Sequence, residues 1–401
     1  MITKELREIG KQYGTPAFVF DTDAFASQAE WIDGIFGEQI SLCYSIKANP
    51  FLLGALPSCI KHVEVCSPGE LTICERLHIP PEMIIYSGVN KGMEDITRAL
   101  RYGVGIVTAE SVQHVRMVNE AAKQLGLQQV PLILRLSNGN QFGMDEKDLA
   151  GVIDERDRYE ALHIMGVHYY TGTQKKKADQ VNKEIRAFTE FLTQLEQEHQ
   201  YAISHVEYGP GLAVEYFNAP FAEKDKQLLG EVAESLHELG SRYHLTVEMG
   251  RFLASSCGYY LTSVADMKNN GGTEYVICDG GINHLKYYGQ TMAMQVPEIT
   301  VIAKDGQLPE AEKETQRYGY TLCGSLCTTA DLLVRKAELP KLQIGDTLVF
   351  HRCGAYTVTE GIGLFLSRAL PAVVLYSGQN GACLVRKPYH TDLWNTPGLE
   401  V

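Results

Sequence analysis

The stretch MIIYSGVNKGMEDITRALRYGVGIVTAE, residues 83–110, contains one unit of the pattern that decides the fold. Its two short apolar runs, MIIYSG and GIVTAE, are typical of buried strands, and EDITRALRYG between them has the spacing of an amphipathic helix. A strand, a helix and a second strand in this order predict parallel strands joined by a helical crossover.

The same alternation continues on both sides, from about residue 25 to 250. The other strand-like runs are ISLCYSIKA (40–48), HVEVCS (62–67), PLILRLS (131–137), IMGVHYY (164–170), HVEYGPG (205–211) and LTVEMG (245–250). Helical patterns between them include 68–77, 111–126 and 181–199. Eight strands alternating with helices predict an α/β fold, a (β/α)8 TIM barrel, over residues 25–252. A doubly wound sheet would alternate in the same way, but eight units is the barrel's number.

After Arg251 the pattern changes to strand-like runs with hardly a helix among them. These runs lie at 258–268, 273–281, 297–304, 345–352, 371–378 and 382–387. They predict a β-rich domain formed by residues 253–401 together with 1–24, which is expected to contribute to the active site and to a dimer interface. The run FVF at 18–20 is expected to pair with these strands rather than with the barrel.

Composition narrows the class of protein. The formal net charge of −13 over 401 residues argues against nucleic acid or an anionic membrane surface as the main partner. No run approaches 18 apolar residues, and the first twenty residues lack the features of a signal peptide. The ten cysteines are scattered without a C-x-x-C pair, which argues against a metal site and indicates reduced thiols. We therefore expect a cytoplasmic protein that crosses no membrane.

Candidate functional residues gather where the predicted barrel strands end. They are Lys47, Ser67, His168, Gly209, Glu248 and Arg251. Active sites of TIM barrels lie at the face formed by the carboxyl ends of the strands. The convergence of these residues on one face predicts an enzyme active site more strongly than any single motif does.

Lys47 stands in YSIKANP, at the end of an apolar strand and just before a proline. A lysine in an apolar setting can act as an amine nucleophile toward a carbonyl cofactor, although a solvated lysine at a strand end is the simpler alternative. With this motif the chain resembles the pyridoxal 5′-phosphate (PLP) enzymes of the alanine-racemase fold, and among them the ornithine, diaminopimelate and related decarboxylases. Their cofactor lysine sits in a Y-x-x-K-A-N motif at the first barrel strand.

The resemblance extends over nearly the whole chain, from FVFDTD at residue 18 to GAYTVTEG at residue 354. Its motifs, in the family's order, are HVEVCSPGEL, QFGMDE, GVHYYTGTQ, VEMGR, CDGG, CGSLCTTAD and GAY. The runs QFGMDE and HYYTGTQ are most similar to the subgroup that acts on carrier-bound or conjugated amino acids in antibiotic and siderophore biosynthesis. The resemblance implies PLP-dependent decarboxylation of an amino acid or amino-acid conjugate, through a Schiff base on Lys47.

Glu248, in VEMGR, decides between two activities of this fold. A carboxylate against the pyridine nitrogen keeps that nitrogen protonated, which makes the ring a strong electron sink for decarboxylation. Racemases of the same fold place an arginine there, so Glu248 favours a decarboxylase. The alternative is a strand-end carboxylate paired with Arg251.

The resemblance implies further cofactor contacts. They are Glu64, Ser67, His168, Tyr170, Thr173, Gly211, Gly250, Arg251 and Tyr356. In GVHYYTGTQ the family's cofactor-stacking histidine corresponds to Tyr170, while His168, two residues earlier, should face the same way. Either ring is a candidate to stack on the cofactor. In YGPGLAV, Pro210 has no backbone N–H to offer a phosphate, so Gly211 is the expected contact.

Cys327, in CGSLC, matches a cysteine that enters the neighbouring subunit's active site and returns a proton to Cα. The resemblance thus implies an obligate homodimer with shared active sites. Thr328 follows it where diaminopimelate and ornithine enzymes have a carboxylate for the substrate's distal ammonium. Together with Asp331 and Lys286 it is a candidate substrate contact, and it favours a neutral, carboxylated or conjugated substrate tail.

Three alternatives stay open from the sequence. One is an amino-acid racemase of the same fold, which would need a second base opposite Lys47. Another is a diaminopimelate or lysine decarboxylase proper, against which Thr328 speaks. The third is a PLP-binding protein without turnover. Release of CO2 distinguishes the decarboxylases from the other two.

Overall fold

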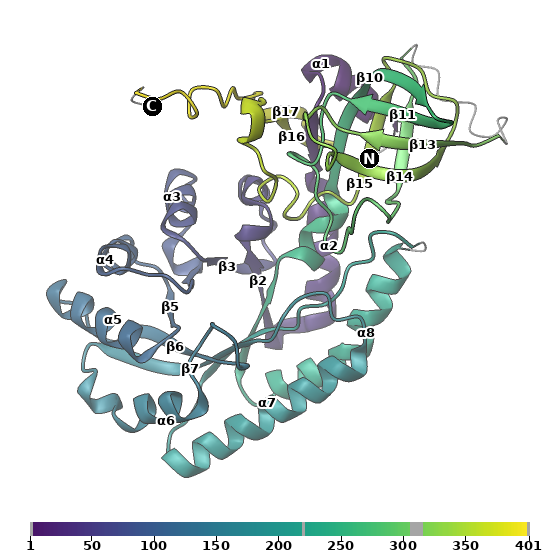
Figure 1. Ribbon diagram of the computed structural model, residues 1–401. Coiled ribbons are helices and arrows are strands. Elements are labelled where there is room, and N and C mark those ends of the chain that lie inside the picture. Colours follow the sequence, from purple (N-terminus) through teal and green to yellow (C-terminus); the bar gives the residue numbers. More distant parts are fainter. Residues whose placement is uncertain (1–2, 219–220, 305–315, 399–401) are drawn as a thin grey trace. The chain divides into compact units, whose positions relative to one another are not determined.

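The computed structural model describes residues 3–218, 221–304 and 316–398. The chain divides into two compact units. One contains residues 28–214 and 222–253, and the other contains residues 1–27, 215–221 and 254–401. Figure 1 shows both units, coloured along the sequence.

The first unit is a closed barrel of eight parallel strands in chain order. The strands are β2 (Ile40–Ser45), β3 (Ile60–Val65), β4 (Ile84–Tyr86), β5 (Ile106–Ala109), β6 (Val130–Leu136), β7 (Leu162–Tyr170), β8 (His205–Gly209) and β9 (His244–Met249). The barrel closes where β9 pairs with β2, with Glu248 opposite Cys43. The predicted TIM barrel is confirmed, and all eight predicted strands are present.

A helix follows each strand from β3 onward. These helices are α3 (Pro68–Arg76), α4 (Met93–Tyr102), α5 (Val112–Gln124), α6 (Glu146–Asp154), α7 (Ala178–His199), α8 (Phe221–Gly240) and the short α9 (Arg251–Ala254). Helix α2 (Thr22–Phe36) precedes β2. Local sequence sets several helix starts, because the side chains of Ser67, Ser111 and Asp145 each accept a hydrogen bond from a first-turn backbone N–H.

The barrel interior has an apolar side and a polar side. A buried cluster of Cys43, Ile85, Ile106 and Ile133 fills the apolar side. The polar side contains buried side chains of β3, β7, β8 and β9 (Glu64, His168, Glu207, Thr246 and Glu248). Burying carboxylates is costly unless they are paired or protonated, so this polar interior indicates a function.

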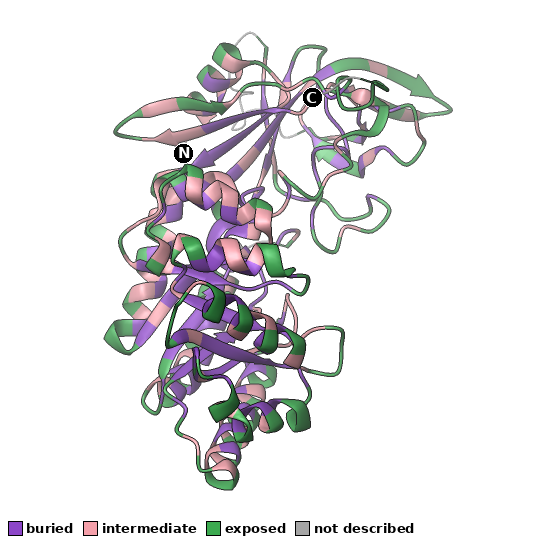
Figure 2. Cartoon of the chain, turned by 90° about the vertical axis from the view of Figure 1, so that its left-hand side faces the viewer, coloured by how far each residue is buried: buried purple, intermediate pink, exposed green. Residues whose placement is uncertain are grey.

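The second unit is built on a nine-stranded sheet, the core of which is buried (Figure 2). Its strands are β1 (Ala17–Asp21), β10 (Gly258–Asn270), β11 (Thr273–Cys278), β12 (Ile299–Ile302), β13 (Tyr318–Cys323), β14 (Leu332–Leu339), β15 (Thr347–His351), β16 (Ala372–Ser377) and β17 (Gly381–Arg386). The continuous path runs β14-β13-β11-β10-β1-β16-β17, and β15 pairs with β10 and β12. Helix α1 (Thr3–Tyr13) packs Leu6 and Ile9 into the core of this unit.

Strand β1 contains the run FVF and confirms its predicted pairing. It runs antiparallel to β10 and parallel to β16, and all five of its residues are buried. Two strands were not predicted, β13 and β14. Strand β14 is the last strand of the path and contains Arg335 and Lys336, which break the apolar pattern, as is common on edge strands.

None of the helices in the described part of the chain has both the length and the apolar content to cross a lipid bilayer.

Candidate active site

Lys47 lies directly after β2, in a single 3₁₀ turn formed by Ile46–Ala48. The turn is held on its far side, where the Tyr44 hydroxyl donates to the Asn49 carbonyl at 2.8 Å and the Asn49 side chain accepts from the Phe51 N–H. The Lys47 ammonium donates to Glu64 Oε2 at 2.7 Å and to Cys66 Sγ at 3.5 Å. This turn therefore fixes the lysine at the carboxyl ends of β2 and β3.

The two partners of this ion pair differ in exposure. The Lys47 side chain is 39% exposed and the Glu64 side chain only 2%. Burial raises the pKa of Glu64, but the Lys47 ammonium and His168 outweigh burial and hold this pKa well below its usual range. The pair thus consists of a reachable amine above a buried, ionised carboxylate.

Ser67 caps helix α3. Its hydroxyl accepts from the Glu70 N–H at 3.1 Å, and the Glu70 carboxylate accepts from the Cys66 N–H at 2.7 Å. This reciprocal arrangement resembles a capping box and fixes the loop between β3 and α3 next to Lys47. Because the Ser67 oxygen acts here as an acceptor, its O–H can still donate to another group. The predicted contact between Ser67 and the cofactor stays a prediction.

A second cluster contains Glu248, His168 and Glu207. His168 Nε2 lies 3.5 Å from Glu248 Oε1, and one ligand-type atom from each of the three residues lies within 4.8 Å of the others. All three side chains are buried. This is the one group of three such side chains that could hold a metal ion within the described residues, and the same carboxylates could instead face a protonated ring nitrogen.

Glu207 was not predicted as a site residue from the sequence. It lies in HVEYG, where alternation places it on the same face as His205 and Gly209, toward the barrel interior. The sequence did contain a signal for this residue, because a glutamate is unusual in the middle of a run that is otherwise typical of a buried parallel strand. Burial, and then Glu248 and Glu64, raise the pKa of the Glu207 carboxyl well above its usual value.

His168 and Tyr170 lie on the same side of β7, as their spacing predicts. Tyr169 between them points the other way and stacks on Phe188 of α7, with ring centroids 4.7 Å apart. Burial and the Glu248 carboxylate raise the pKa of Tyr170, so this residue remains a neutral phenol. A Cβ at Gly209 would lie 2.4 Å from Glu248 Oε1 and 2.6 Å from Tyr170 Cδ2, so a larger residue there would have to displace these two side chains.

The turn after β8 meets the turn after β7. Gly211 has a φ of +60°, and a Cβ there would lie 1.8 Å from the Gly172 carbonyl oxygen. The Lys175 N–H donates to the Gly211 carbonyl at 2.9 Å, which joins the two turns. Thr173 lies between these contacts, and Gly250 and Arg251 follow β9. The predicted phosphate contacts of the barrel thus come from the ends of three adjacent strands.

Three charged residues at the neighbouring strand ends were also not predicted from the sequence. Arg135 Nη1 lies 2.7 Å from Glu110 Oε1, and Glu110 Oε2 accepts from the Gly143 N–H at 3.0 Å. Burial lowers the pKa of Arg135, but the neighbouring Glu110 carboxylate outweighs burial and raises this pKa above its usual value. Lys91 is buried and donates to the Gly88 carbonyl, and burial lowers the pKa of Lys91 to about 8. These groups lie on loops or strands whose local sequence carries no distinctive motif.

In the second unit, the loop from Gly324 to Asp331 carries three of the predicted residues. Cys327 is exposed and Thr328 is half-buried. The Asp331 carboxylate is buried and accepts from the Ile282 N–H at 2.9 Å and the Leu326 N–H at 2.7 Å. Both carboxylate oxygens of Asp331 thus hold the backbone around this loop, and its predicted contact with the substrate stays a prediction.

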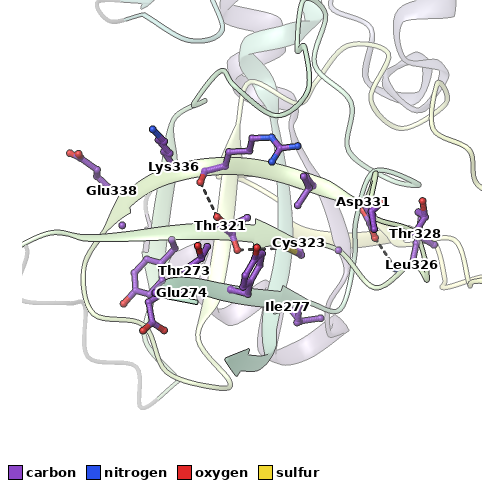
Figure 3. A pocket seen from close by; sticks show the side chains of 18 residues that line it. Thr273, Glu274, Ile277, Thr321, Cys323, Leu326, Thr328, Asp331, Lys336 and Glu338 are labelled. Carbon is purple, nitrogen blue, oxygen red and sulfur yellow. Dashed lines mark hydrogen bonds between the residues drawn. The ribbon is translucent and has the colours of Figure 1, made fainter. Parts of the chain in front are cut away.

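This loop borders a hollow of about 900 Å³ on β11, β13 and β14 (Figure 3). Thr328 and Asp331 line it, together with Thr273, Thr321, Arg335 and Lys336. Lys286 is exposed beside a second hollow of about 480 Å³, where its Nζ lies 3.8 Å from Glu360 Oε2. Tyr356 lies in a turn of the same unit with a φ of +67°.

Comparisons with known proteins identify this arrangement. The family model described as "Pyridoxal-dependent decarboxylase, pyridoxal binding domain" matches residues 23–255, more than half of the chain. The diaminopimelate decarboxylase of Aquifex aeolicus is 25% identical over 99% of this chain and 94% of its own. The L-glutamyl-[BtrI acyl-carrier protein] decarboxylase of Niallia circulans is also 25% identical, over 97% and 95%.

A third relative acts on a conjugate by name. The 2-[(L-alanin-3-ylcarbamoyl)methyl]-2-hydroxybutanedioate decarboxylase of Staphylococcus aureus is 24% identical over 89% of this chain and 93% of its own. Among solved structures, the M. jannaschii diaminopimelate decarboxylase in complex with L-lysine superposes with a TM-score of 0.83, at 23% identity over 98% of this chain and 94% of that one. This likeness confirms the fold.

Proposed function

Because the chain belongs to the pyridoxal-dependent decarboxylase family, we propose that its amino-acid decarboxylation runs on PLP bound covalently to Lys47. The observation that supports this assignment is the Lys47–Glu64 ion pair, which presents a reachable amine at the carboxyl end of the first barrel strand. Active sites of TIM barrels lie at that face.

The described residues fit the cofactor. Glu248 Oε2 is buried and has no hydrogen-bond partner among the described residues, as expected of an atom that waits for a ring N–H. The absence of a Cβ at Gly209 leaves room for Tyr170 beside Glu248. Glu248 would face the pyridine nitrogen, and Tyr170 or His168 would cover the ring.

The remaining cofactor contacts are assigned from the positions of the residues at the strand ends. Glu64 and Ser67 would lie beside the cofactor next to Lys47. The proposed phosphate contacts are Thr173, Gly211, Gly250, Arg251 and Tyr356, which offer hydroxyls, backbone N–H groups and one guanidinium. Pro210 offers no N–H, so Gly211 carries the backbone contact of its turn.

When bound, PLP supplies an electron sink for the electron pair left at Cα as CO2 departs. The chain's own residues support that chemistry in three ways. The Glu248 carboxylate holds a proton at the ring nitrogen, the neutral phenol of Tyr170 excludes water, and the ionised Glu64 holds the Lys47 amine in place. Lys47 moves the proton that exchanges between its own amine and the substrate amine.

Return of a proton to Cα is assigned to Cys327 of a partner subunit. Cys327 is exposed on its loop, so it is accessible for an intermolecular role, whereas Cys43, Cys257 and Cys353 are buried. This assignment requires a homodimer with shared active sites, and it makes each monomer inactive alone.

We infer that the substrate has a neutral, carboxylated or conjugated tail. The half-buried hydroxyl of Thr328 provides no anion for a distal ammonium, and Lys286 is a cation that suits a carboxylate. Two of the relatives are named for a carrier-bound and a conjugated substrate, which supports the subgroup of antibiotic and siderophore biosynthesis. Diaminopimelate is the alternative, because other relatives are named for it.

A CO2-release screen tests the proposal. The panel contains diaminopimelate, lysine, ornithine, glutamate, and citryl- or carrier-linked amino acids. We expect visible cofactor absorbance and CO2 from a conjugate, both abolished in Lys47→Ala and retained in Lys61→Ala, an exposed lysine on β3. CO2 from diaminopimelate alone would overturn the substrate assignment. Scrambled Cα stereochemistry without CO2 would replace the decarboxylase with a racemase.

A further inference from the structure

Glu207 is a buried carboxyl group that the reaction described above does not use. Its side chain is 0% exposed, and neither of its carboxyl oxygens has a hydrogen-bond partner among the described residues. An ionised carboxylate in such a position would be very costly, and a protonated carboxyl would need an acceptor for its O–H.

The backbone pairing places Glu207 between the two strands that carry the candidate ring partners. On one side it is opposite His168 of β7, and on the other it is opposite Thr246 of β9, two residues before Glu248. A carboxyl oxygen of Glu207 lies within 4.8 Å of both a His168 ring nitrogen and a Glu248 carboxylate oxygen. Glu207 and Glu248 thus form a pair of acids inside the barrel.

The charges around Glu207 favour one proton on this pair. The titratable groups that act on it from the surrounding elements are Cys43 of β2, Lys47, Glu64 of β3, Arg135 of β6, His168 of β7 and Glu248 of β9. Two neighbouring carboxylates in a low-dielectric interior do not both ionise. Glu207 is completely buried, neither of its oxygens has a hydrogen-bond partner and no ion pair joins it to any described residue, so the proton belongs on Glu207.

We propose that Glu207 is a positioning residue, a neutral carboxylic acid that donates a hydrogen bond to Glu248 and keeps the Glu248 carboxylate charged and oriented. An ionised carboxylate has lone pairs on both oxygens, so Glu248, which lies within 4.8 Å of Glu207, can accept from Glu207 as well as from a ring N–H. The consequence for the cofactor rests on the proposed function, since it requires Glu248 at the pyridine nitrogen. The protonation of Glu207 does not depend on that assignment.

Two substitutions test whether position 207 must donate a hydrogen bond. Glu207→Gln keeps a neutral donor of the same shape, whereas Glu207→Met keeps the volume and removes the donor. We expect cofactor affinity and kcat in Glu207→Gln within a few fold of the parent chain. In Glu207→Met we expect a loss on the order of ten- to a hundredfold, the usual effect of a lost hydrogen bond to a charged group.

The pH profile reports more than a structural defect. Without its donor, the charged form of Glu248 is less favoured, so the acid limb of kcat and the absorbance transition of the bound cofactor should both move to higher pH in Glu207→Met. Ile85→Met is the control for volume changes in the same interior, and it should leave both transitions in place.

Infrared difference spectroscopy of the cofactor-free protein is the deciding experiment, because it needs no activity. The parent chain should show a protonated carboxyl band that persists to alkaline pH and disappears in Glu207→Gln. A parent spectrum without this band, or variants Gln and Met that are equally impaired, would overturn the proposal. If the band is present but the protein binds no PLP, the proposed function has failed and the Glu207 assignment stands.

Discussion

The Lys47 ammonium lies 2.7 Å from Glu64 Oε2, and this contact joins a partly exposed amine of the barrel to a carboxylate that solvent hardly reaches. Removal of one member of such a pair leaves the other unbalanced. The two members should therefore respond differently to substitution, since only Glu64 is buried.

Lys47→Met should destabilise the cofactor-free protein by at most roughly 3 kcal/mol, because it leaves the Glu64 charge buried and unpaired. The double variant Lys47→Met/Glu64→Gln should recover most of that loss. Urea unfolding at pH 7 measures both. If the double variant is less stable than Lys47→Met, the buried charge is not the cause.

The Lys47–Glu64 pair should also make the stability of the folded protein fall in acid. The folded pKa of Glu64 lies below its unfolded value, so its stabilisation is complete above the unfolded pKa of about 4.3 and is lost as pH falls below it. In Lys47→Met this acid-side loss should shrink or change sign.

His205 should make the barrel sensitive to mild acid. Burial, and then His244 and His62, lower the pKa of His205 to about 3. The unfolded chain takes up this proton below about pH 6.5, so the contribution of His205 is lost between about pH 6.5 and 3, by about 2 kcal/mol at pH 5. Unfolding of His205→Gln and of the parent chain, each at pH 7 and pH 5, measures this. An equal loss in both proteins would exclude His205 as the source.

Gly209→Ala tests the space beside Glu248. The added Cβ would lie 2.4 Å from Glu248 Oε1, so we expect at least a tenfold loss of cofactor affinity in a protein that still folds. Gly230→Ala in α8 is the matched control, because nothing lies within 4 Å of its added Cβ, and it should gain up to about 1 kcal/mol of stability. Retention of cofactor by Gly209→Ala at parental affinity would show that Glu248 and Tyr170 can move apart freely.

Much of the fold followed from the sequence, for physical reasons that differ between its parts. The barrel strands are buried on both faces, so they appear as apolar runs, and the run FVF was assigned to the correct sheet. Strand β14 was missed because an edge strand tolerates charges such as Arg335 and Lys336.

The site followed less completely. Lys47, Glu248 and His168 carry motifs or strand-end positions, and those were visible. Glu207, Lys91 and the Arg135–Glu110 pair depend on which strands close next to each other in three dimensions, which one sequence does not specify. Asp331 carries a family motif, yet its role in holding a loop becomes visible only through its backbone hydrogen bonds.

Shared active sites predict complementation between two inactive variants. Cys327→Ala and Lys47→Ala should each lose most activity, whereas Cys383→Ala, another exposed cysteine, should not. When the two inactive proteins are mixed and allowed to exchange subunits, about a quarter of the sites combine intact residues and activity should return. If mixing restores no activity although mixed dimers form, Cys327 does not act across an interface.

The most direct test of the central assignment is reductive trapping of the cofactor followed by peptide mass spectrometry. The described barrel contains two buried lysines, Lys91 and Lys175, which act as internal competitors of the half-exposed Lys47. We expect the reduced PLP label on the peptide that contains Lys47. A label on Lys91 or Lys175, or no label in a protein that releases CO2, would contradict it.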